Sequence, residues 1–291
     1  MSNPLISVLI PVYNAEKYIR DTLLSVTEQS YRNLEIIVLN DGSTDSSEDI
    51  IRSVSDDRIR YISRENRGVG SARNTLLSLA SGEMVLFVDA DDVLSSDFIE
   101  KLFLAKERTK SGIASSAVVP FRGKRPGEKK RKKESVVYSG REFVRLMVKP
   151  AGVFCYSHSR LFDRALFSGL SFPEDRIFED VVLMPQVVLR AEKVVLVNDA
   201  VYHYRINRQG LSHGPFTHRA LDEMDGYLSN IDLGLKIGDR KIVYYSGLFF
   251  LTKYYFYYWR VLFRGMGLKE YLERFREEKT RVIRLLKGKS L

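Results

Sequence analysis

The 291 residues are enough to bury a substantial core, as one large or two small domains. Hydrophobic residues make up 44% and charged residues 29%, and the single cysteine, Cys155, excludes an internal disulfide and a cysteine-based metal cluster. The N-terminus lacks the pattern of a secretory signal, and no apolar run is long enough for a spanning helix. We therefore expect a globular protein of a reducing compartment, in the cytoplasm.

Apolar runs and helical patterns alternate through the first hundred residues. The runs predict buried strands, and helices are predicted after the first three of them. Such alternation predicts a parallel sheet with right-handed connections, covered by helices. Pro11 is expected to end the first strand, because proline has no N–H group for a central ladder. The four predicted strands cover 5–10, 34–39, 59–62 and 84–88.

The fourth predicted strand is followed by Asp89, Asp91 and Asp92. Three carboxylates within four residues repel one another and resist desolvation, so a shared cation is expected. The carboxyl edge of parallel strands is where open α/β sheets bind ligands. Oxygen ligands suit Mg²⁺ or Mn²⁺, which commonly hold substrate phosphates. The alternative is that Asp91 or Asp92 only begins a surface turn.

Other polar segments fall at the same predicted edge. Residues 11–13 follow the first strand, and Asp41 follows the second. A dinucleotide-binding loop is not predicted at Gly68-Val69-Gly70, because Arg73 stands where the third glycine would be and the loop follows the third strand. The convergence of distant segments at one edge is the main sequence evidence for a site.

Four motifs in this half occur in the order and approximate spacing of glycosyltransferase family 2, which the chain resembles. They are Ile6-Ser7-Val8-Leu9-Ile10-Pro11-Val12-Tyr13-Asn14, Asn40-Asp41-Gly42-Ser43-Thr44-Asp45, Gly70-Ser71-Ala72-Arg73-Asn74 and Asp89-Ala90-Asp91-Asp92. The resemblance implies a GT-A fold, which is an α/β fold with a doubly wound, mixed and mostly parallel sheet flanked by helices, here with a C-terminal helical extension. It also implies a nucleotide-sugar donor, a divalent metal and inversion at the anomeric carbon.

The resemblance assigns roles to matching residues. Asp41 resembles the aspartate that hydrogen-bonds the base, commonly uracil, and Arg73 resembles the arginine beside the diphosphate. Implied metal ligands, for Mn²⁺ or Mg²⁺, are Asp91, Asp89 and His203, although a histidine between two tyrosines is as often structural. The implied nucleotide-sugar contacts are Pro11, Val12, Tyr13, Glu16, Asp41, Arg73, Asp89, Ala90 and Arg205.

Glu179 and Asp180 follow a Phe-Pro segment at Phe172-Pro173 and open a predicted helix. Acidic residues are stabilised at a helix N-terminus by the helix dipole, which accounts for one of them without chemistry. The resemblance implies that Asp180 is the catalytic base, which removes the proton of the acceptor hydroxyl during a single displacement. Glu179 would orient Asp180 or bind the acceptor.

The second half contains further predicted strands at 113–121, 136–138 and 194–197, with no element predicted for 151–162. Its net positive charge lies in residues 121–134, at +6, and residues 239–291, at +8, whereas the remainder carries −5. No nucleic-acid motif accompanies these basic segments, so an anionic membrane surface or an acidic acceptor is expected instead. A solvated loop is the alternative for 121–134.

Three amphipathic helices are predicted beyond residue 217, and they have different expected partners. The aromatic helix at 244–259 is expected to pack within the protein. The basic helix at 268–286 is expected to lie on a membrane, consistent with a lipid-linked acceptor. Packing on the catalytic domain or on a second copy of the chain is thus the expectation for the aromatic helix and the alternative for the basic helix, whereas the membrane surface is the alternative for the aromatic helix.

We predict a GT-A catalytic domain over 1–215, with a nucleotide-sugar-binding part at 1–120 and an acceptor and catalytic-base part at 135–215, and a helical region at 216–291. The expected activity is transfer of a hexosyl or N-acetylhexosaminyl group from a UDP-sugar to a saccharide or lipid-linked acceptor in cell-surface polysaccharide synthesis. A sugar-phosphate nucleotidyltransferase is the alternative enzyme, but it would carry a basic Gly-rich loop near the first strand. A non-enzymatic binding module would leave the acidic strand ends unexplained.

Overall fold

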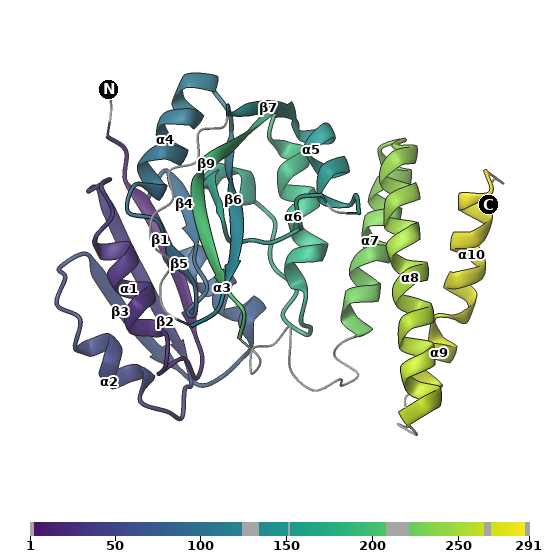
Figure 1. Ribbon diagram of the computed structural model, residues 1–291, viewed down its shortest axis with the longest axis horizontal. Helices are drawn as coiled ribbons and strands as arrows, with labels where there is room; N and C mark the ends of the chain where they lie inside the picture. Colours follow the sequence, from purple (N-terminus) through teal and green to yellow (C-terminus); the bar gives the residue numbers. More distant parts are fainter. Residues whose placement is uncertain (1–2, 124–133, 151, 208–220, 265–268, 289–291) are drawn as a thin grey trace. The chain divides into compact units, whose positions relative to one another are not determined.

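The computed structural model describes residues 3–123, 134–150, 152–207, 221–264 and 269–288 (Figure 1). The chain forms two compact units. The first consists of Met1–Gly140, Ser157–Asp175 and Val187–Gly214, and the second of Arg141–Tyr156, Arg176–Gln186 and Pro215–Leu291. The predicted domain boundary after residue 215 falls among residues 208–220, outside the described residues.

The first unit holds a mixed sheet that contains nine strands in the described residues. Their order is β3-β2-β1-β4-β8-β6-β9-β5, and β7 pairs with β9. Strands β1, β2, β3 and β4 pair in parallel, as do β6 and β9, whereas the pairs that involve β5, β7 and β8 are antiparallel. The predicted mixed sheet is confirmed. The strands are β1 (Ile6–Val12), β2 (Leu34–Asp41), β3 (Ile59–Arg64), β4 (Met84–Phe87), β5 (Val93–Leu94), β6 (Ile113–Phe121), β7 (Val136–Ser139), β8 (Arg160–Asp163) and β9 (Lys193–Arg205).

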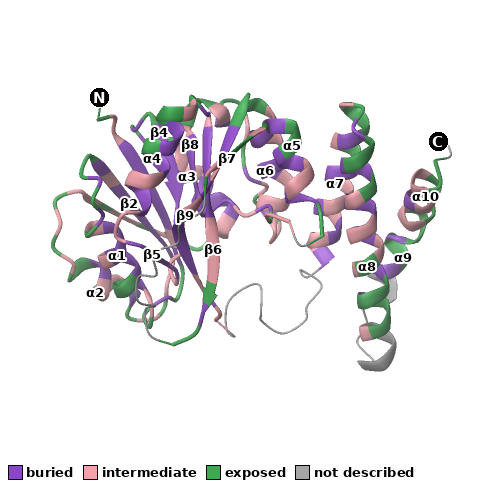
Figure 2. Ribbon diagram, turned by 45° about the horizontal axis from the view of Figure 1, so that its top comes forward, coloured by how far each residue is buried: buried purple, intermediate pink, exposed green. Residues whose placement is uncertain are grey.

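Helices cover this sheet because its central strands are apolar on both faces. Ile6 and Val8 pack into the same core as Leu23 of α1 (Ile19–Thr27) and Phe98 of α4 (Phe98–Thr109). The alternate residue Leu9 is also fully buried, and α3 (Val69–Leu79) contacts β1 and β2. Figure 2 shows the central strands buried along most of their length. The remaining helix of this part is α2 (Ser47–Arg52), and a short 3-10 helix, η1, spans Arg164–Phe167.

Pro11 lies inside β1, so the prediction that it ends the strand is wrong. Its neighbour β4 ends at Phe87, which pairs with Leu9. Beyond Leu9 only β2 continues beside β1, with Pro11 opposite Leu39. The missing N–H group of Pro11 is tolerated because the strand has only one paired neighbour there.

The second unit is helical in its described residues. It contains α5 (Gly140–Met147) from its second residue onward, the first part of α6 (Glu179–Arg190), α7 (Asp222–Lys236), α8 (Arg240–Arg264), α9 (Lys269–Arg274) and α10 (Arg276–Leu286). A separate core joins these last helices, where Met224 and Ile231 of α7 lie in one cluster with Phe250 of α8 and Val282 of α10. No helix within the described ranges is long and apolar enough to cross a membrane.

Asp239 ties α5 to the start of α8. Its carboxylate, only 1% exposed, accepts hydrogen bonds from Arg145 Nε at 2.9 Å and from the amide of Lys241 at 3.1 Å. Burial alone would raise the pKa of Asp239, but the hydrogen bonds from Arg145 and the amides outweigh it and hold that pKa below its usual value.

Asp239→Asn is expected to lower the free energy of unfolding by about 1–2 kcal/mol at pH 7, because the charge-assisted bonds to Arg145 are lost. The folded pKa lies below the unfolded value of about 3.9, so the contribution is present above that value and is lost as pH falls through the folded pKa. Urea denaturation at several pH values measures it. Asp97→Asn, at a half-exposed pair with Lys101, is the control and should change stability by less than about 0.5 kcal/mol. An equal loss at pH 3 and pH 7 would contradict the assignment.

Candidate functional site

Two loops at the carboxyl ends of β1 and β2 are joined by reciprocal hydrogen bonds. Asn14 donates its amide to Ser43 Oγ at 2.9 Å, and its side-chain oxygen accepts from the amide of Thr44 at 2.8 Å. Glu16 Oε2 accepts from the amide of Ser46 at 3.1 Å. These bonds hold the loop that contains the predicted nucleotide contacts Tyr13 and Glu16. Tyr13 is 53% exposed and follows the buried end of β1.

Asp41, at the end of β2, holds the turn that precedes α3. Its carboxylate accepts from Arg64 Nε at 2.7 Å and from the amides of Arg67 and Gly68, the latter at 2.9 Å. Gly68 has a φ of 87°, a conformation that favours glycine. The side chain predicted to contact the base is therefore also the residue that shapes the adjacent loop.

Arg73 and Asp89 form an ion pair just after β4, in which the Arg73 side chain is buried and the Asp89 side chain is 29% exposed. Arg73 Nη2 lies 3.0 Å from Asp89 Oδ1, and the Arg73 side chain is 7% exposed. Its guanidinium carbon also lies 5.7 Å from the centre of the Phe172 ring. The guanidinium of Arg73 is thus held beside the acidic turn and provides positive charge there. The family resemblance implies that the diphosphate of the donor binds at this position.

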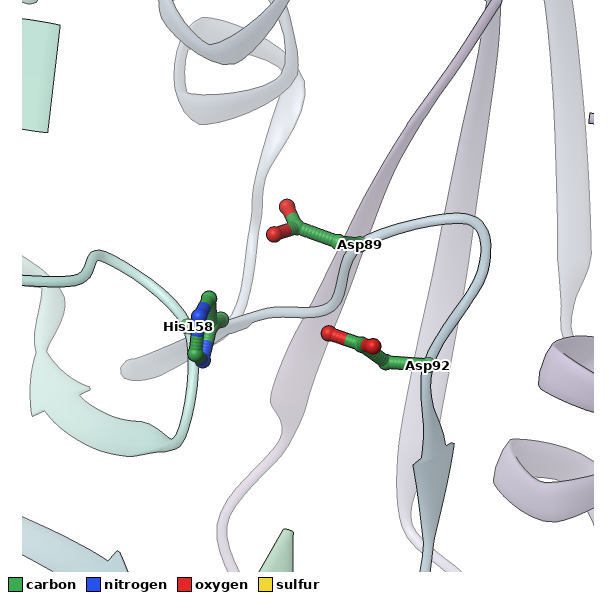
Figure 3. A group of neighbouring side chains, drawn as sticks. All are labelled: Asp89, Asp92 and His158. Atoms are coloured by element: carbon green, nitrogen blue, oxygen red, sulfur yellow. The ribbon is translucent and has the colours of Figure 1, made fainter. Parts of the chain in front are cut away.

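Asp89, Asp92 and His158 bring one ligand atom each to within 4.8 Å of one another. Figure 3 shows the two carboxylates and the imidazole gathered about one space, with Asp89 and Asp92 on the turn after β4 and His158 on the segment before β8. His158 also stacks on Tyr202 with the ring centres 4.6 Å apart. The hydroxyl of Tyr202 accepts a hydrogen bond from the amide of Asp89 at 3.2 Å. Carboxylate and imidazole ligands fit a divalent cation such as Mn²⁺.

The acidic turn carries more buried charge than its cations balance. Burial and the neighbouring charge of Asp89 raise the pKa of Asp91 to about 6. Burial, together with the charges of Asp89 and Asp91, raises the pKa of Asp92 well above its ordinary value. Burial would also raise the pKa of Asp89, but the positive charge of Arg73 lowers it. Burial lowers the pKa of His158 to about 4, helped by the charges of Arg160 and Arg73. A neutral imidazole among crowded carboxylates suits a cation as their shared partner.

The side chain of Arg205 hydrogen-bonds the acidic turn and two other segments of the chain. Its Nε donates to Asp91 O at 2.7 Å, Nη1 donates to Gly123 O at 2.7 Å, and Nη2 lies 3.2 Å from Asp21 Oδ2. The guanidinium carbon lies 4.9 Å from the centre of the Tyr18 ring. The structure thus surrounds Arg205 with protein groups, and the predicted contact with the donor stays a prediction.

The predicted metal ligands Asp91 and His203 have different surroundings from the cluster of Asp89, Asp92 and His158. Asp91 Oδ2 accepts a hydrogen bond from Asn207 Nδ2 at 3.2 Å. His203 lies on β9 opposite Val93 and meets the ring of Phe121 edge-on at 6.1 Å. The predicted set of Asp89, Asp91 and His203 therefore stays a prediction, and only Asp89 is shared with the observed cluster.

The Phe-Pro segment is fixed against α3. Asn74 donates to Phe172 O at 2.9 Å and to Glu174 Oε1 at 2.8 Å, and accepts from the amide of Phe172 at 2.8 Å. A Cβ atom on Gly70 would lie 2.1 Å from Pro173 O, so only glycine fits there. A surface hollow of ≈ 590 Å³ lies beside this segment, but Glu174 is the one carboxylate in its lining, so we place no chemistry there.

Glu179 and Asp180 form the first turn of α6, in the second unit. Glu179 is 2% exposed, and Asp180 Oδ1 accepts from the amide of Val181 at 2.9 Å. Phe178, just before them, has a φ of 61°, in the left-handed region that a bulky residue rarely adopts. Such strain of about 1–3 kcal/mol is retained mostly where function demands it. The predicted role of Asp180 as the catalytic base stays a prediction.

Sequence reasoning missed His158 as a ligand and also missed Tyr202, whereas Asp92 was among the three carboxylates expected to share a cation and was left out only of the ligand set that the resemblance implies. Asp92 was visible as the third acid of the turn. His158 carries no local ligand spacing, because its partners are more than sixty residues away. Ser159, next to it, has a φ of 65°, which turns the chain at this point but leaves no sequence signal.

The profile of the family described as "Glycosyl transferase family 2" matches residues 7–170, which contain Asp41, Arg73, Asp89 and His158. The chain belongs to glycosyl transferase family 2. The motifs that suggested this family from the sequence thus lie within the matched region, and the predicted family is confirmed.

Curated relatives of this family 2 chain include bacterial glycosyltransferases. "Glycosyltransferase GlyA" of Streptococcus pneumoniae serotype 4 is 36% identical over 226 residues, which are 71% of this chain and 31% of GlyA. "Glycosyltransferase GlyG" of the same organism is 29% identical over 69% of this chain and 70% of its own. "Minor teichoic acid biosynthesis protein GgaB" of Bacillus subtilis is 29% identical over 71% of this chain and 23% of GgaB. The chain therefore spans less than a third of two of these relatives.

Solved structures share the fold of this family 2 chain. Residues 1–349 of S. aureus TarS, in complex with UDP-GlcNAc, align with a TM-score of 0.66 and 22% identity, over 84% of this chain and 71% of that one. The mannosyltransferase PcManGT of Pyrobaculum calidifontis, in complex with GDP-Man and Mn²⁺, aligns with a TM-score of 0.58 and 18% identity, over 98% and 86%. These likenesses confirm the predicted fold.

Proposed function

We propose that the protein is an inverting glycosyltransferase that transfers a sugar from a nucleotide-sugar donor, a UDP-sugar, to a saccharide or lipid-linked acceptor in the synthesis of cell-surface polysaccharide. The observation that carries the proposal is the turn after β4, where the Arg73–Asp89 pair lies beside the cluster of Asp89, Asp92 and His158. This turn follows β4, which pairs in parallel with β1 and so ends at the edge where the β1 and β2 loops are joined.

A divalent cation fits this turn. Asp89, Asp92 and His158 would hold it, with Asp91 and His203 as the alternative partners of Asp89 that the family resemblance implies. When bound, the cation supplies charge that balances a departing diphosphate. Imidazole and carboxylate together suit Mn²⁺ better than Mg²⁺, which prefers oxygen ligands alone.

The other proposed roles, which are donor binding, stabilisation of the leaving group and proton removal, belong to side chains of the protein. Pro11, Val12, Tyr13 and Glu16 border the nucleoside, and Asp41 either receives the base or shapes the loop that does. Arg73 would place positive charge where negative charge develops on the leaving group. Asp180 would accept the proton of the acceptor hydroxyl on the opposite side of the sugar, with Glu179 orienting it.

The comparisons favour a UDP-sugar as the first donor to test, since TarS binds UDP-GlcNAc, although PcManGT binds GDP-Man. The name of GgaB associates one relative with teichoic acid, a cell-surface polymer. Membership of family 2 also argues against the alternative of a sugar-phosphate nucleotidyltransferase.

Thermal unfolding with UDP-GlcNAc, UDP and GDP-mannose, each with and without Mn²⁺, tests the proposal. A donor present at 100 times its Kd should stabilise the protein by about 2.7 kcal/mol, and only with the cation. Product release is then followed with the donor that binds: free nucleoside diphosphate is expected. Release of pyrophosphate from UTP and a sugar phosphate would instead identify a nucleotidyltransferase, and no response to any nucleotide would overturn the proposal.

A further inference from the structure

Helix α7 is held in the second unit by the apolar core of that unit. Met224 and Ile231 of α7 lie in one cluster with Phe250 of α8. The basic helix that was expected to lie on a membrane contributes to the same cluster, where Phe275 and Val282 are each 1% exposed, and its membrane contact stays a prediction. Because close packing in this cluster fixes α7, the helix is a firm support for the other segments that it contacts.

The first turn of α6 is a second partner of α7, and both belong to the second unit (Figure 1). Asp222 and Asn230 are eight residues apart, about two helical turns, so they lie on one face of α7. Asp222 Oδ2 accepts a hydrogen bond from the amide of Ile177 at 3.0 Å. Asn230 Nδ2 donates to Val181 O at 3.2 Å. One face of α7 therefore binds the backbone on both sides of the acid pair Glu179-Asp180.

Asn230 supplies a hydrogen bond that α6 cannot make for itself. In a regular α-helix the carbonyl of Val181 would accept from the amide of residue 185, four positions later. Residue 185 is a proline inside α6, and proline has no N–H group. An unpaired buried carbonyl is costly, and the side chain of Asn230, only 1% exposed, provides the missing donor. This pairing explains why α7 buries an asparagine here.

Gly226 lets the two helices approach closely between these hydrogen bonds. A Cβ atom at position 226 would lie 2.7 Å from Cγ1 and 3.0 Å from Cβ of Val181. A larger residue would therefore push α7 away from α6 and lengthen both hydrogen bonds. The two bonds also bracket Phe178, whose φ of 61° is a strained conformation for a bulky residue. Such strain persists only where surrounding contacts maintain it.

We propose that Asp222 and Asn230 of α7 are positioning residues for Asp180. They fix the backbone on both sides of the acid pair, and so fix the direction of the Asp180 carboxylate. The inference rests on the proposed role of Asp180 as the base, which it deepens. A base must lie within hydrogen-bond reach of the acceptor hydroxyl, and a misplacement of about 1 Å costs up to about 100-fold in rate.

Asn230→Leu tests the bond to Val181, because leucine has a similar shape but no donor. No other hydrogen bond is lost, since Asn230 Oδ1 has no partner among the described residues. The turnover number, measured as release of UDP from the UDP-sugar that the wild type uses, should fall by about 10- to 100-fold. The affinity for UDP with Mn²⁺ and the number of UDP sites per chain should not change.

Pro185→Ala restores an N–H group four residues after Val181, so it should compensate for the loss of Asn230. The double variant Asn230→Leu with Pro185→Ala is expected to recover turnover to within about threefold of the wild type, a coupling that independent sites would not show. Recovery distinguishes a specific effect on the Val181 carbonyl from a general effect on the packing of α7.

Two substitutions at Asp222 differ only in whether an acceptor remains. Asp222→Asn keeps an oxygen that can accept from the amide of Ile177, whereas Asp222→Ala does not. We expect Asp222→Ala to lower turnover by about tenfold or more. Asp222→Asn should stay within about threefold of the wild type, because the bond to the amide is retained.

Ile231→Val is the matched control, because Ile231 belongs to the core cluster of the second unit, which contains no residue of α6. It should lower the urea midpoint, as Asn230→Leu does, but leave turnover within about twofold of the wild type. Circular dichroism and the number of UDP sites per chain check that every variant folds.

Three results would overturn the inference: wild-type turnover in Asn230→Leu, a loss that Pro185→Ala does not restore, or an equal loss in Ile231→Val. Asp180→Asn, measured beside these variants, separates them from a failure of the proposed function. If Asp180→Asn loses turnover and Asn230→Leu does not, only the positioning role fails. If Asp180→Asn turns over like the wild type, the proposed base itself is wrong.

Discussion

Asp180→Asn is expected to lower the turnover number by about 10² to 10⁴, the range for a lost general base. Asparagine keeps the shape of the side chain at the start of α6 but cannot accept the proton of an acceptor hydroxyl. The affinity for the nucleotide should not change, since Asp180 is not among the proposed donor contacts. Steady-state kinetics and nucleotide titration, run on the same preparation, separate the two effects.

Asp175→Asn is the matched control, because Asp175 is an exposed acid five residues earlier in the same segment. It should leave turnover within about twofold of the wild type, as expected for a residue outside the chemistry. A wild-type turnover number in Asp180→Asn would remove Asp180 from the mechanism. A parallel loss in both variants would indicate a general effect of charge in this segment.

Asp89→Asn is expected to weaken Mn²⁺-dependent nucleotide binding by more than about 100-fold. Loss of a residue that only supports a metal ligand costs about 10- to 100-fold, so loss of a ligand should cost more. The amide oxygen can still accept from Arg73, which limits the accompanying loss of stability. Calorimetric titration of UDP with and without Mn²⁺ measures the change, and the electron paramagnetic resonance signal of free Mn²⁺ measures cation binding without turnover.

Two histidine variants distinguish the observed cluster from the ligand set that the family resemblance implies. His158→Gln should reduce Mn²⁺ affinity if the cluster of Asp89, Asp92 and His158 holds the cation, and His203→Gln should then have little effect. The opposite result would favour Asp89, Asp91 and His203. Equal UDP affinity with and without Mn²⁺ in the wild type would contradict both sets.

The parallel part of the sheet was predictable because its strands are short, continuous and apolar. The runs at 34–39 and 84–88 have no competing helical pattern, and each is followed by a turn or a helix signal. The predicted strands coincide with β1 to β4 to within two residues at each end. Local sequence determines these strands because burial on both faces leaves a strong signal.

Two of the antiparallel strands, β5 and β8, were not predictable in the same way. β5 has two residues, and β8 begins at Arg160, whose side chain is among the largest that are fully buried. An arginine gives no sign of a buried strand. β9 extends to Arg205, well past the predicted end at 197, because pairing with β5 and β6 sustains it where polar residues obscure the pattern.

The candidate site was predictable to the extent that it lies on the ends of the parallel strands. Asp41, Arg73 and Asp89 are each followed or preceded by an element that the sequence identifies. His158 was not predictable, because its place beside Asp92 depends on the chain's return to β4 through β8, an antiparallel contact between distant residues.

The absence of a side chain at Gly70 has a consequence for how this region changes in evolution. Since any larger residue would press on the backbone carbonyl of Pro173, and every residue at position 173 would carry that carbonyl, position 70 is expected to remain glycine whatever residue occupies position 173. The residues from Phe172 onward lead along the chain to Glu179 and Asp180. A substitution at a position that bears no functional group would therefore displace the backbone of the Phe172-Pro173 segment.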